Sequence, residues 1–188
     1  AMTPYSGLGF FLTLALALLP AVILGLRGKD LRVCGFAVTA IMLILIFDTP
    51  QKLLTLALFW LWQLAMIFLY LRMRKKSEKR WILWVFLLLS LLPLIFTKLS
   101  VFVQELSVFS MLGISYVSFR AVQILVEIYD GHLTKLCPLD VSYFLLFFPS
   151  ILSGPLDRYQ RFSADLRKTR SPEAYETLLK EGLWRLAT

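Results

Sequence analysis

The sequence predicts an all-α integral membrane protein with several helices that cross the bilayer. Three observations predict this fold class. Hydrophobic residues make up 59% of the chain and charged residues 17%, whereas a soluble domain averages about 45–50% and about 25%. The apolar residues form long blocks, such as GFFLTLALALLPAVILGL at 9–26 and LLTLALFWLWQLAMIFLYL at 53–71. Basic residues lie in short loops between the blocks, which indicates membrane topology and not nucleic-acid binding.

Five apolar runs are expected to be transmembrane helices within one membrane domain that includes all of 1–188. They cover about 7–26, 31–47, 51–72, 81–97 and 113–130, close to the length of about 20 residues that a crossing needs. The first run has no basic segment before it and no small-residue cleavage site after it, so we expect a retained helix and not a signal peptide. Asp48-Thr49-Pro50 ends the second run, and Pro50 suits the start of the next helix.

The basic loops predict how the chain is oriented in the membrane. The loops after the first and third runs carry Arg27, Lys29, Arg32, Arg72, Arg74, Lys75, Lys76, Lys79 and Arg80. Loops rich in lysine and arginine stay in the cytoplasm. We therefore expect a multi-pass protein of the cell membrane with its N-terminus outside, and with 98–112 outside as well.

The segment at about 139–155 is expected to be re-entrant. Its apolar part, 141–152, is only about a dozen residues long, and Pro149 and the Ser-Gly-Pro at 153–155 interrupt its far end. The basic tail that follows favours a return to the cytoplasm. A short, tilted crossing of a thinned bilayer is the alternative. Ser171, Pro172 and Glu173 then predict a cytosolic helix from about 172.

Four polar residues form a stripe on the fifth apolar run. Tyr116, Arg120, Gln123 and Glu127 follow one another at intervals of four, three and four residues, which places them on one face of a helix. A lipid-facing arginine near the bilayer centre costs at least a few kcal/mol, so the stripe is expected to face protein or a wet cavity. It is either an interhelical network that fixes packing or the wall of a polar tunnel.

Other candidates for chemistry are few. His132 follows Asp130-Gly131 in a predicted loop, has no partner at metal-ligand spacing and is interpreted as a solvated residue. Cys34 and Cys137 are far apart in sequence and are expected to be reduced thiols. We therefore expect no metal site and no complete active site in this chain.

Two motifs carry a resemblance to a known family. LGISYVSFRAVQILVEIYDG at 112–131, followed by FFPSILSGPLDRYQRF at 147–162, resembles the membrane-bound O-acyltransferase family. The details SFRAV…E…DG and SGPLDR are similar to its Dlt branch, which transfers D-alanine to teichoic acids. The resemblance covers about 105–165, and the four preceding runs are compatible with it.

The resemblance implies a ring of helices around a thinned membrane centre, with a tunnel between the two sides. The donor would be a D-alanyl thioester on the phosphopantetheine arm of a cytosolic carrier protein, with no cofactor bound directly. Teichoic acid outside would be the acceptor, with a further membrane-anchored protein of the Dlt pathway as partner. The family's catalytic histidine lies in a later helix, so this chain is expected to be an N-terminal half that is inactive alone.

Candidate tunnel or substrate-path residues under this resemblance are Ser115, Tyr116, Arg120, Gln123, Glu127, Ser153, Gly154, Pro155, Asp157 and Arg158. Two other functions stay open. One is an O-acetyltransferase of an exported polysaccharide, of the alginate-acetylase type, in the same family. The other is a non-enzymatic membrane scaffold or a transporter fragment, although the internal hydropathy repeat typical of transporters is not seen in these spans.

Overall fold

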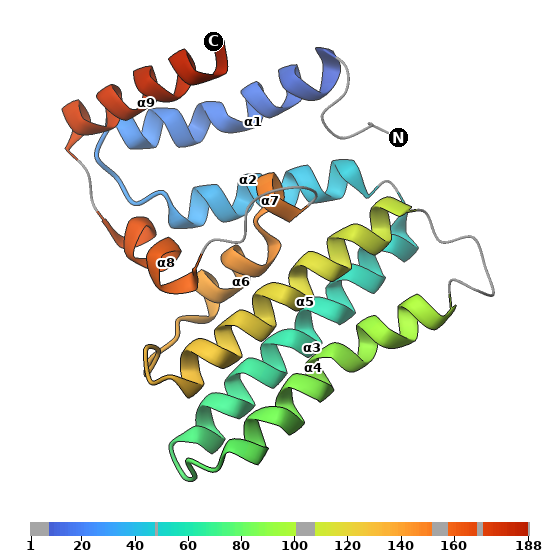
Figure 1. Ribbon diagram of the computed structural model, residues 1–188. Coiled ribbons are helices and arrows are strands. Elements are labelled where there is room, and N and C mark those ends of the chain that lie inside the picture. Colours follow the sequence, from blue (N-terminus) through green and yellow to red (C-terminus); the bar gives the residue numbers. More distant parts are fainter. Residues whose placement is uncertain (1–7, 48, 101–107, 152–157, 169–170, 188) are drawn as a thin grey trace.

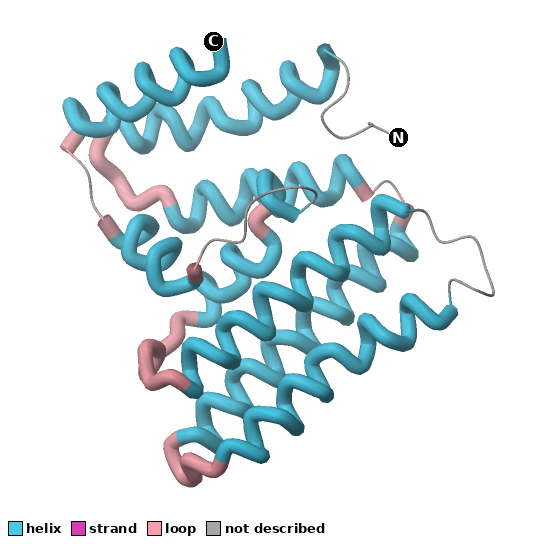
Figure 2. The backbone as a smooth tube through the Cα atoms, viewed as in Figure 1, coloured by secondary structure: helices cyan, strands magenta, loops and turns pink. Residues whose placement is uncertain are grey.

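The computed structural model describes residues 8–47, 49–100, 108–151, 158–168 and 171–187. Every regular element among them is a helix (Figures 1 and 2), which confirms the predicted all-α class for this part of the chain. The helices are α1 Leu8–Leu26, α2 Arg32–Ile46, α3 Pro50–Arg74, α4 Arg80–Ser100, α5 Val108–Tyr129, α6 Pro138–Leu146, α7 Phe148–Ile151, α8 Tyr159–Arg167 and α9 Pro172–Ala187.

Proline and glycine set several of the helix boundaries. Pro50 and Pro138 occupy the first turns of α3 and α6, where the missing N–H has no partner to lose. Gly28 and Gly131 follow α1 and α5 with positive φ angles of 64° and 79°, a conformation that glycine adopts without strain. The first five helices coincide with the predicted apolar runs to within five residues at each end. The largest difference is at α5, which starts at Val108, inside the segment 98–112 that was predicted to precede it.

The best-packed part of the molecule is the three-helix group α3, α4 and α5, in which each helix contacts the other two. Its centre includes Ile67 of α3 and Val117 and Leu125 of α5, all 0% exposed. Between α3 and α4, the buried Gln63 donates from Nε2 to the backbone oxygen of Ser90 at 2.9 Å and accepts a hydrogen bond from the Ser90 hydroxyl. Such polar pairs hold helices together where the surroundings are apolar.

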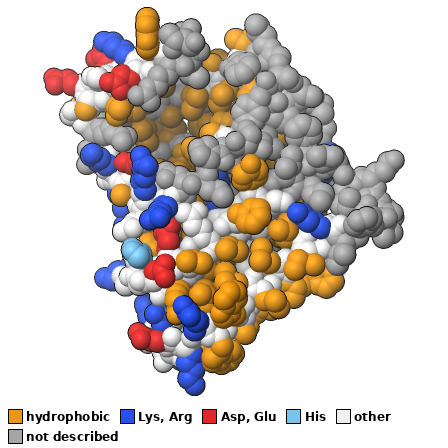
Figure 3. Space-filling model, viewed as in Figure 1, with side chains coloured by type: hydrophobic (Ala, Val, Ile, Leu, Met, Phe, Trp, Pro, Cys, Tyr) orange, Lys and Arg blue, Asp and Glu red, His pale blue; other side chains and the backbone are white. Residues whose placement is uncertain are grey.

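Two of the described helices are long and apolar enough to cross a membrane. They are α3 and the Arg80–Lys98 part of α4, and only 33% and 28% of their apolar windows are buried. Leu58, Trp84 and Leu88 on these helices are at least 60% exposed, and Figure 3 shows apolar side chains over this part of the surface. The apolar stretches in α1 and α2, Leu12–Leu26 and Arg32–Ile46, are shorter. The five-span topology stays a prediction.

Charged side chains gather at one end of the molecule. Helices α1, α3 and α5 end there, and α2, α4, α6 and α9 begin there (Figure 1), and the same edge carries most of the visible Lys, Arg, Asp and Glu (Figure 3). The loops predicted to be cytoplasmic therefore share one side. We call this side the basic end.

The segment predicted to be re-entrant is a broken helix. α6 ends at Leu146, Phe147 leaves the helix with φ −50° and ψ 102°, and the short α7 follows. The chain then comes back to the basic end, where α8 packs against α6 (Figure 1). Residues 152–157 lie outside the described residues. Re-entry into a membrane stays a prediction, although the start of α6 and α8 both lie at the basic end (Figure 1).

The C-terminal helix starts where the sequence predicts. α9 begins at Pro172 and lies alongside α1, and the Ser171 hydroxyl accepts the backbone N–H of Ala174 at 3.3 Å as an N-cap. The Tyr175 ring of α9 packs directly on Gly25 of α1, where a Cβ would collide with it. The cytosolic location of α9 stays a prediction.

Candidate functional site

Arg120 lies near the middle of α5 and is 2% exposed. Its Nη1 donates hydrogen bonds to the backbone oxygens of Phe144 at 2.7 Å and of Leu145 at 3.2 Å. Its guanidinium carbon lies 5.4 Å from the centre of the Phe144 ring. The last carbonyls of a helix have no partner within the helix, and the partial negative charge there attracts a cation. Arg120 therefore caps the C-terminus of α6, next to the break at Phe147.

Glu127, near the C-terminal end of α5, contacts the start of a helix with a negative charge, whereas Arg120 contacts the end of a helix with a positive charge. Its Oε2 accepts the backbone N–H of Gln160 at 3.3 Å, and its Oε1 accepts a hydrogen bond from Nε2 of Gln123 at 3.2 Å. Gln160 lies in the first turn of α8, where the helix carries partial positive charge. Glu127 therefore caps the N-terminus of α8, and Gln123 orients its carboxylate.

The polar stripe of α5 thus contacts both the C-terminal end of α6 and the N-terminal end of α8. A cation faces the end of α6 and an anion faces the start of α8, so each charge matches the helix terminus that it meets. These contacts supply the packing role that the sequence left open for Arg120, Gln123 and Glu127. That the same residues border a substrate path stays a prediction.

The other residues predicted to border a substrate path are half-buried, exposed or outside the described residues. Ser115 and Tyr116 are half-buried on α5, and Arg158 is exposed just before α8. Ser153, Gly154, Pro155 and Asp157 lie outside the described residues. His132 is exposed in the loop between α5 and α6. Among the described residues, no group of three His, Cys, Asp or Glu side chains is placed to hold a metal ion.

An ion pair that the sequence analysis missed joins the start of α6 to the end of α8. Asp140 is 0% exposed, and its Oδ2 accepts hydrogen bonds from Nε of Arg167 at 3.0 Å and Nη2 at 2.8 Å. Its Oδ1 lies 4.0 Å from Nη1 of Arg32 at the start of α2. The Asp140 carboxylate raises the pKa of Arg167. The available signal was an aspartate two residues after a helix-starting proline, which identifies a first-turn anion but not its partner.

An aromatic cluster seals the same junction. Aromatic rings from α6 contact two rings of α8, with ring centres 5.2–5.4 Å apart in tilted or edge-to-face geometry. The rings are those of Tyr143, Phe144 and the C-cap residue Phe147 on one side and of Tyr159 and Phe162 on the other. Such pairs add to the stabilisation from apolar burial. Tyr159 is 2% exposed, and its hydroxyl has no hydrogen-bond partner among the described residues. Burial, with the charge of Asp140, raises the pKa of Tyr159.

The sequence is similar to those of three curated transferases. Its relatives are teichoic acid D-alanyltransferases. The chain is 39% identical to the one from Bacillus subtilis (strain 168), with 98% of this chain and 49% of the relative aligned. It is 31% identical to the one from Streptococcus thermophilus, with 97% and 45% aligned. It is 33% identical to the one from Lacticaseibacillus rhamnosus, with 97% and 46% aligned.

The chain therefore spans about half the length of the curated relatives that it matches. A search of protein-family models finds no match, so the membrane-bound O-acyltransferase family is named by the sequence resemblance alone. The relatives' names support an acyltransferase and favour neither the polysaccharide acetyltransferase nor the transporter fragment. Together with α3 and α4, they indicate a membrane protein.

Proposed function

We propose that this chain is the N-terminal half of a teichoic acid D-alanyltransferase of the membrane-bound O-acyltransferase type. The observation that carries the proposal is the similarity to three transferases of that name along 97–98% of the chain. The exposed apolar faces of α3 and α4 support a place in the membrane. The charged contacts between α5, α6 and α8 support a built polar interior and not a simple membrane anchor.

The reaction is an acyl transfer from sulfur to oxygen. A hydroxyl of teichoic acid attacks the carbonyl carbon of the D-alanyl thioester, the new C–O ester bond forms, and the C–S bond breaks. A general base takes the hydroxyl proton and the departing thiolate is reprotonated. The base is a histidine in a part of the protein beyond this chain, and this chain alone is inactive.

This half supplies the scaffold for the transfer path. The phosphopantetheine arm of the carrier protein approaches from the basic end, because its phosphate is anionic and the lysine and arginine side chains there attract it. Arg120 and Glu127 fix the broken segment around Phe147, so that α6 and α7 border a tunnel toward the opposite end. The acceptor and a membrane-anchored partner act on that opposite, outer side.

The test uses the full-length gene in a strain that lacks its own transferase. Esterified D-alanine on the cell wall is expected to return with the full-length gene and to stay absent with residues 1–188 alone, although both proteins reach the membrane. If the full-length protein is present and the wall gains O-acetyl esters but no D-alanine, the acetyltransferase alternative replaces this proposal.

A further inference from the structure

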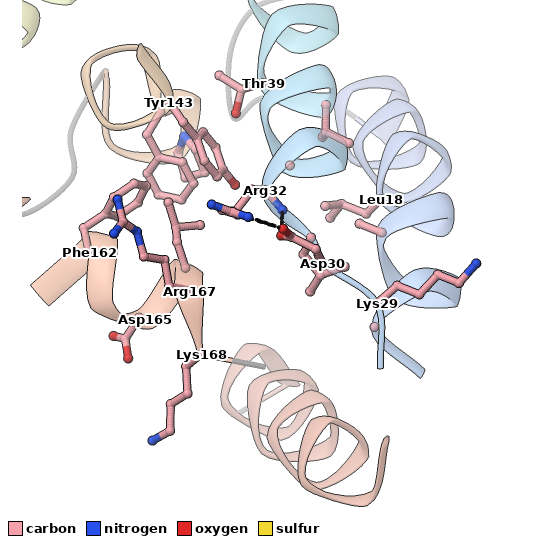
Figure 4. A pocket seen from close by; sticks show the side chains of 18 of the residues that line it. Leu18, Lys29, Asp30, Arg32, Thr39, Tyr143, Phe162, Asp165, Arg167 and Lys168 are labelled. Carbon is pink, nitrogen blue, oxygen red and sulfur yellow. Dashed lines mark hydrogen bonds and ion pairs between the residues drawn. The ribbon is translucent and has the colours of Figure 1, made fainter. Parts of the chain in front are cut away.

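A cavity of about 850 Å³ lies on the other side of α6 from the polar stripe. It is bounded by α1, α2, the α6–α7 break, α8 and Tyr175 of α9 (Figure 4). Its apolar walls come from Leu14, Leu18 and Ala21 of α1, Val38 of α2 and Phe148 of α7. From Leu14 to Gly25 the wall along α1 is about 16 Å long, at 1.5 Å per residue. The cavity is thus long, apolar and of ligand size.

Two glycines allow close helix contacts at the flanks of this cavity. Gly25 and Gly35 both line the cavity, and each is covered by a tyrosine from a neighbouring helix. The Tyr175 ring packs on Gly25, and the Tyr143 hydroxyl packs on Gly35, so that a Cβ at either glycine would collide. The two tyrosines therefore hold α9 against α1 and α6 against α2 at the flanks.

The mouth of the cavity at the basic end has excess positive charge. Lys29, Arg32, Arg167 and Lys168 line it together with two carboxylates, Asp30 and Asp165. Asp30 is held by Arg32 through hydrogen bonds of 2.6–2.9 Å (Figure 4). Lys29 and Lys168 stand on opposite sides of this mouth with their side chains directed outward (Figure 4), and neither has a carboxylate partner among the described residues. Both are therefore available to turn toward an anion that reaches the mouth.

We propose that this cavity binds an anionic phospholipid of the membrane leaflet at the basic end. The acyl chain fills the apolar space beside α1, and the phosphate lies at the mouth near Lys29 and Lys168. Basic pockets between membrane helices on the cytoplasmic side recognise anionic headgroups in this way. A free phosphate compound would leave the apolar walls uncovered. The proposal requires α1 and α2 to lie in the membrane, and it is independent of D-alanyl transfer.

The test is photo-crosslinking of the full-length protein in nanodiscs of mixed phosphatidylglycerol and phosphatidylcholine. The probe is phosphatidylglycerol with a diazirine on its acyl chain. We expect labelled peptides from α1 and α2, and roughly tenfold less labelling in Ala21→Phe, which places a ring inside the cavity. The matched control is Ala15→Phe, because Ala15 is exposed on the same helix and does not line the cavity. Labelling of Ala15→Phe is expected to equal that of the wild type.

The headgroup is tested separately. Lys29→Gln with Lys168→Gln is expected to abolish the preference for phosphatidylglycerol over a phosphatidylcholine probe, whereas Lys75→Gln with Lys76→Gln keeps it. Soluble glycerol phosphate is not expected to compete. Three results would overturn the proposal. The first is no labelling of α1 and α2 in the wild type, as expected if another part of the full-length protein fills the cavity. The others are equal labelling by both lipid probes and displacement of the lipid probe by glycerol phosphate. The set of peptides labelled in the wild-type protein tests the proposal even if one of the variants fails to fold.

Discussion

Arg120 donates two hydrogen bonds to backbone carbonyls at the end of α6. The substitution Arg120→Ala removes both hydrogen bonds and leaves these carbonyl groups buried. We expect the free energy of unfolding to fall by about 2–4 kcal/mol, because a hydrogen bond to a charged group contributes about 1.5–3 kcal/mol. Thermal unfolding of the full-length protein in mild detergent measures the change. Esterified D-alanine on the wall is measured in parallel.

Two variants make the Arg120 result specific. Arg120→Lys keeps the charge but not the planar guanidinium, so its loss is expected to be smaller. Arg72→Ala removes an exposed arginine at the end of α3 and is expected to change stability by less than about 0.5 kcal/mol. Normal unfolding of Arg120→Ala with lost ester would contradict a capping role and would place Arg120 in the substrate path.

Tyr159 tests whether its ring or its hydroxyl stabilises the α6–α8 junction. The hydroxyl is buried without a partner among the described residues, so Tyr159→Phe is expected to be neutral or slightly stabilising. Tyr159→Ala removes ring contacts with Phe144 and is expected to cost about 3–5 kcal/mol. A destabilised Tyr159→Phe in thermal unfolding would show that the hydroxyl has a partner.

The same hydroxyl predicts a response to alkaline pH. Burial and the charge of Asp140 raise the pKa of Tyr159 in the folded protein, so the folded state holds this proton more tightly than the unfolded state. Stability from this group is present below the unfolded pKa of about 10 and is lost as pH rises above it. Unfolding curves between pH 9 and 11 are expected to shift less in Tyr159→Phe than in the wild type. Identical shifts would contradict this.

At the scale of elements, the Asp140–Arg167 pair fixes α8 to α6 at a distance of 27 residues in sequence. A double-mutant cycle with Asp140→Ala and Arg167→Ala is expected to give a coupling free energy of about 1–2 kcal/mol. A fully buried pair costs about 3–5 kcal/mol to break, but the Arg167 side chain is 53% exposed, and water screens the attraction. Denaturation in mild detergent gives the four values.

The chain contains a natural control for this cycle. Lys180 and Glu176 form an exposed pair one turn apart on α9, at 2.6 Å. Alanine substitutions at these two positions are expected to be additive, because solvent and side-chain entropy cancel most of the benefit of exposed pairs. Additivity at Asp140 and Arg167 as well would show that this ion pair does not help to hold α8 against α6.

Helix positions were predictable because the signals for them are local. The break at Phe147 lies two residues before Pro149, where the sequence predicted an interruption. Apolar runs bounded by charged residues, together with Pro50, predicted α1 to α5 from the chain itself. The stripe on α5 was predictable for the same reason, since helical spacing alone places Arg120 and Glu127 on one face.

The partners of those residues were not predictable. Arg120 contacts backbone oxygens 24 and 25 residues away, and Glu127 contacts a backbone N–H 33 residues away. Backbone groups are the same at every residue, so no residue type in the sequence identifies them. Asp140 was missed because a first-turn aspartate already has a local explanation at a helix N-terminus.

At the scale of the whole molecule, the two ends differ in charge. Lys75 and His132 are exposed in loops at the basic end, whereas Gln51 and Lys98 are exposed near the start of α3 and the end of α4, at the opposite end. Single cysteines at these four positions therefore report which end faces the cytoplasm. The labelling uses the full-length protein, in which Cys34 and Cys137, both free thiols, and any further cysteines are replaced by serine to give a silent background.

Cysteine labelling with a membrane-impermeant maleimide on spheroplasts then tests the orientation. Gln51→Cys and Lys98→Cys are expected to react from outside, whereas Lys75→Cys and His132→Cys react only after permeabilisation. The physical reason is that lysine- and arginine-rich loops are retained in the cytoplasm. The reversed pattern would place the carrier-protein side outside, where no cytosolic thioester reaches it, and would remove the donor route from the proposed function. Labelling of all four before permeabilisation would contradict a chain that crosses the membrane through α3 and α4.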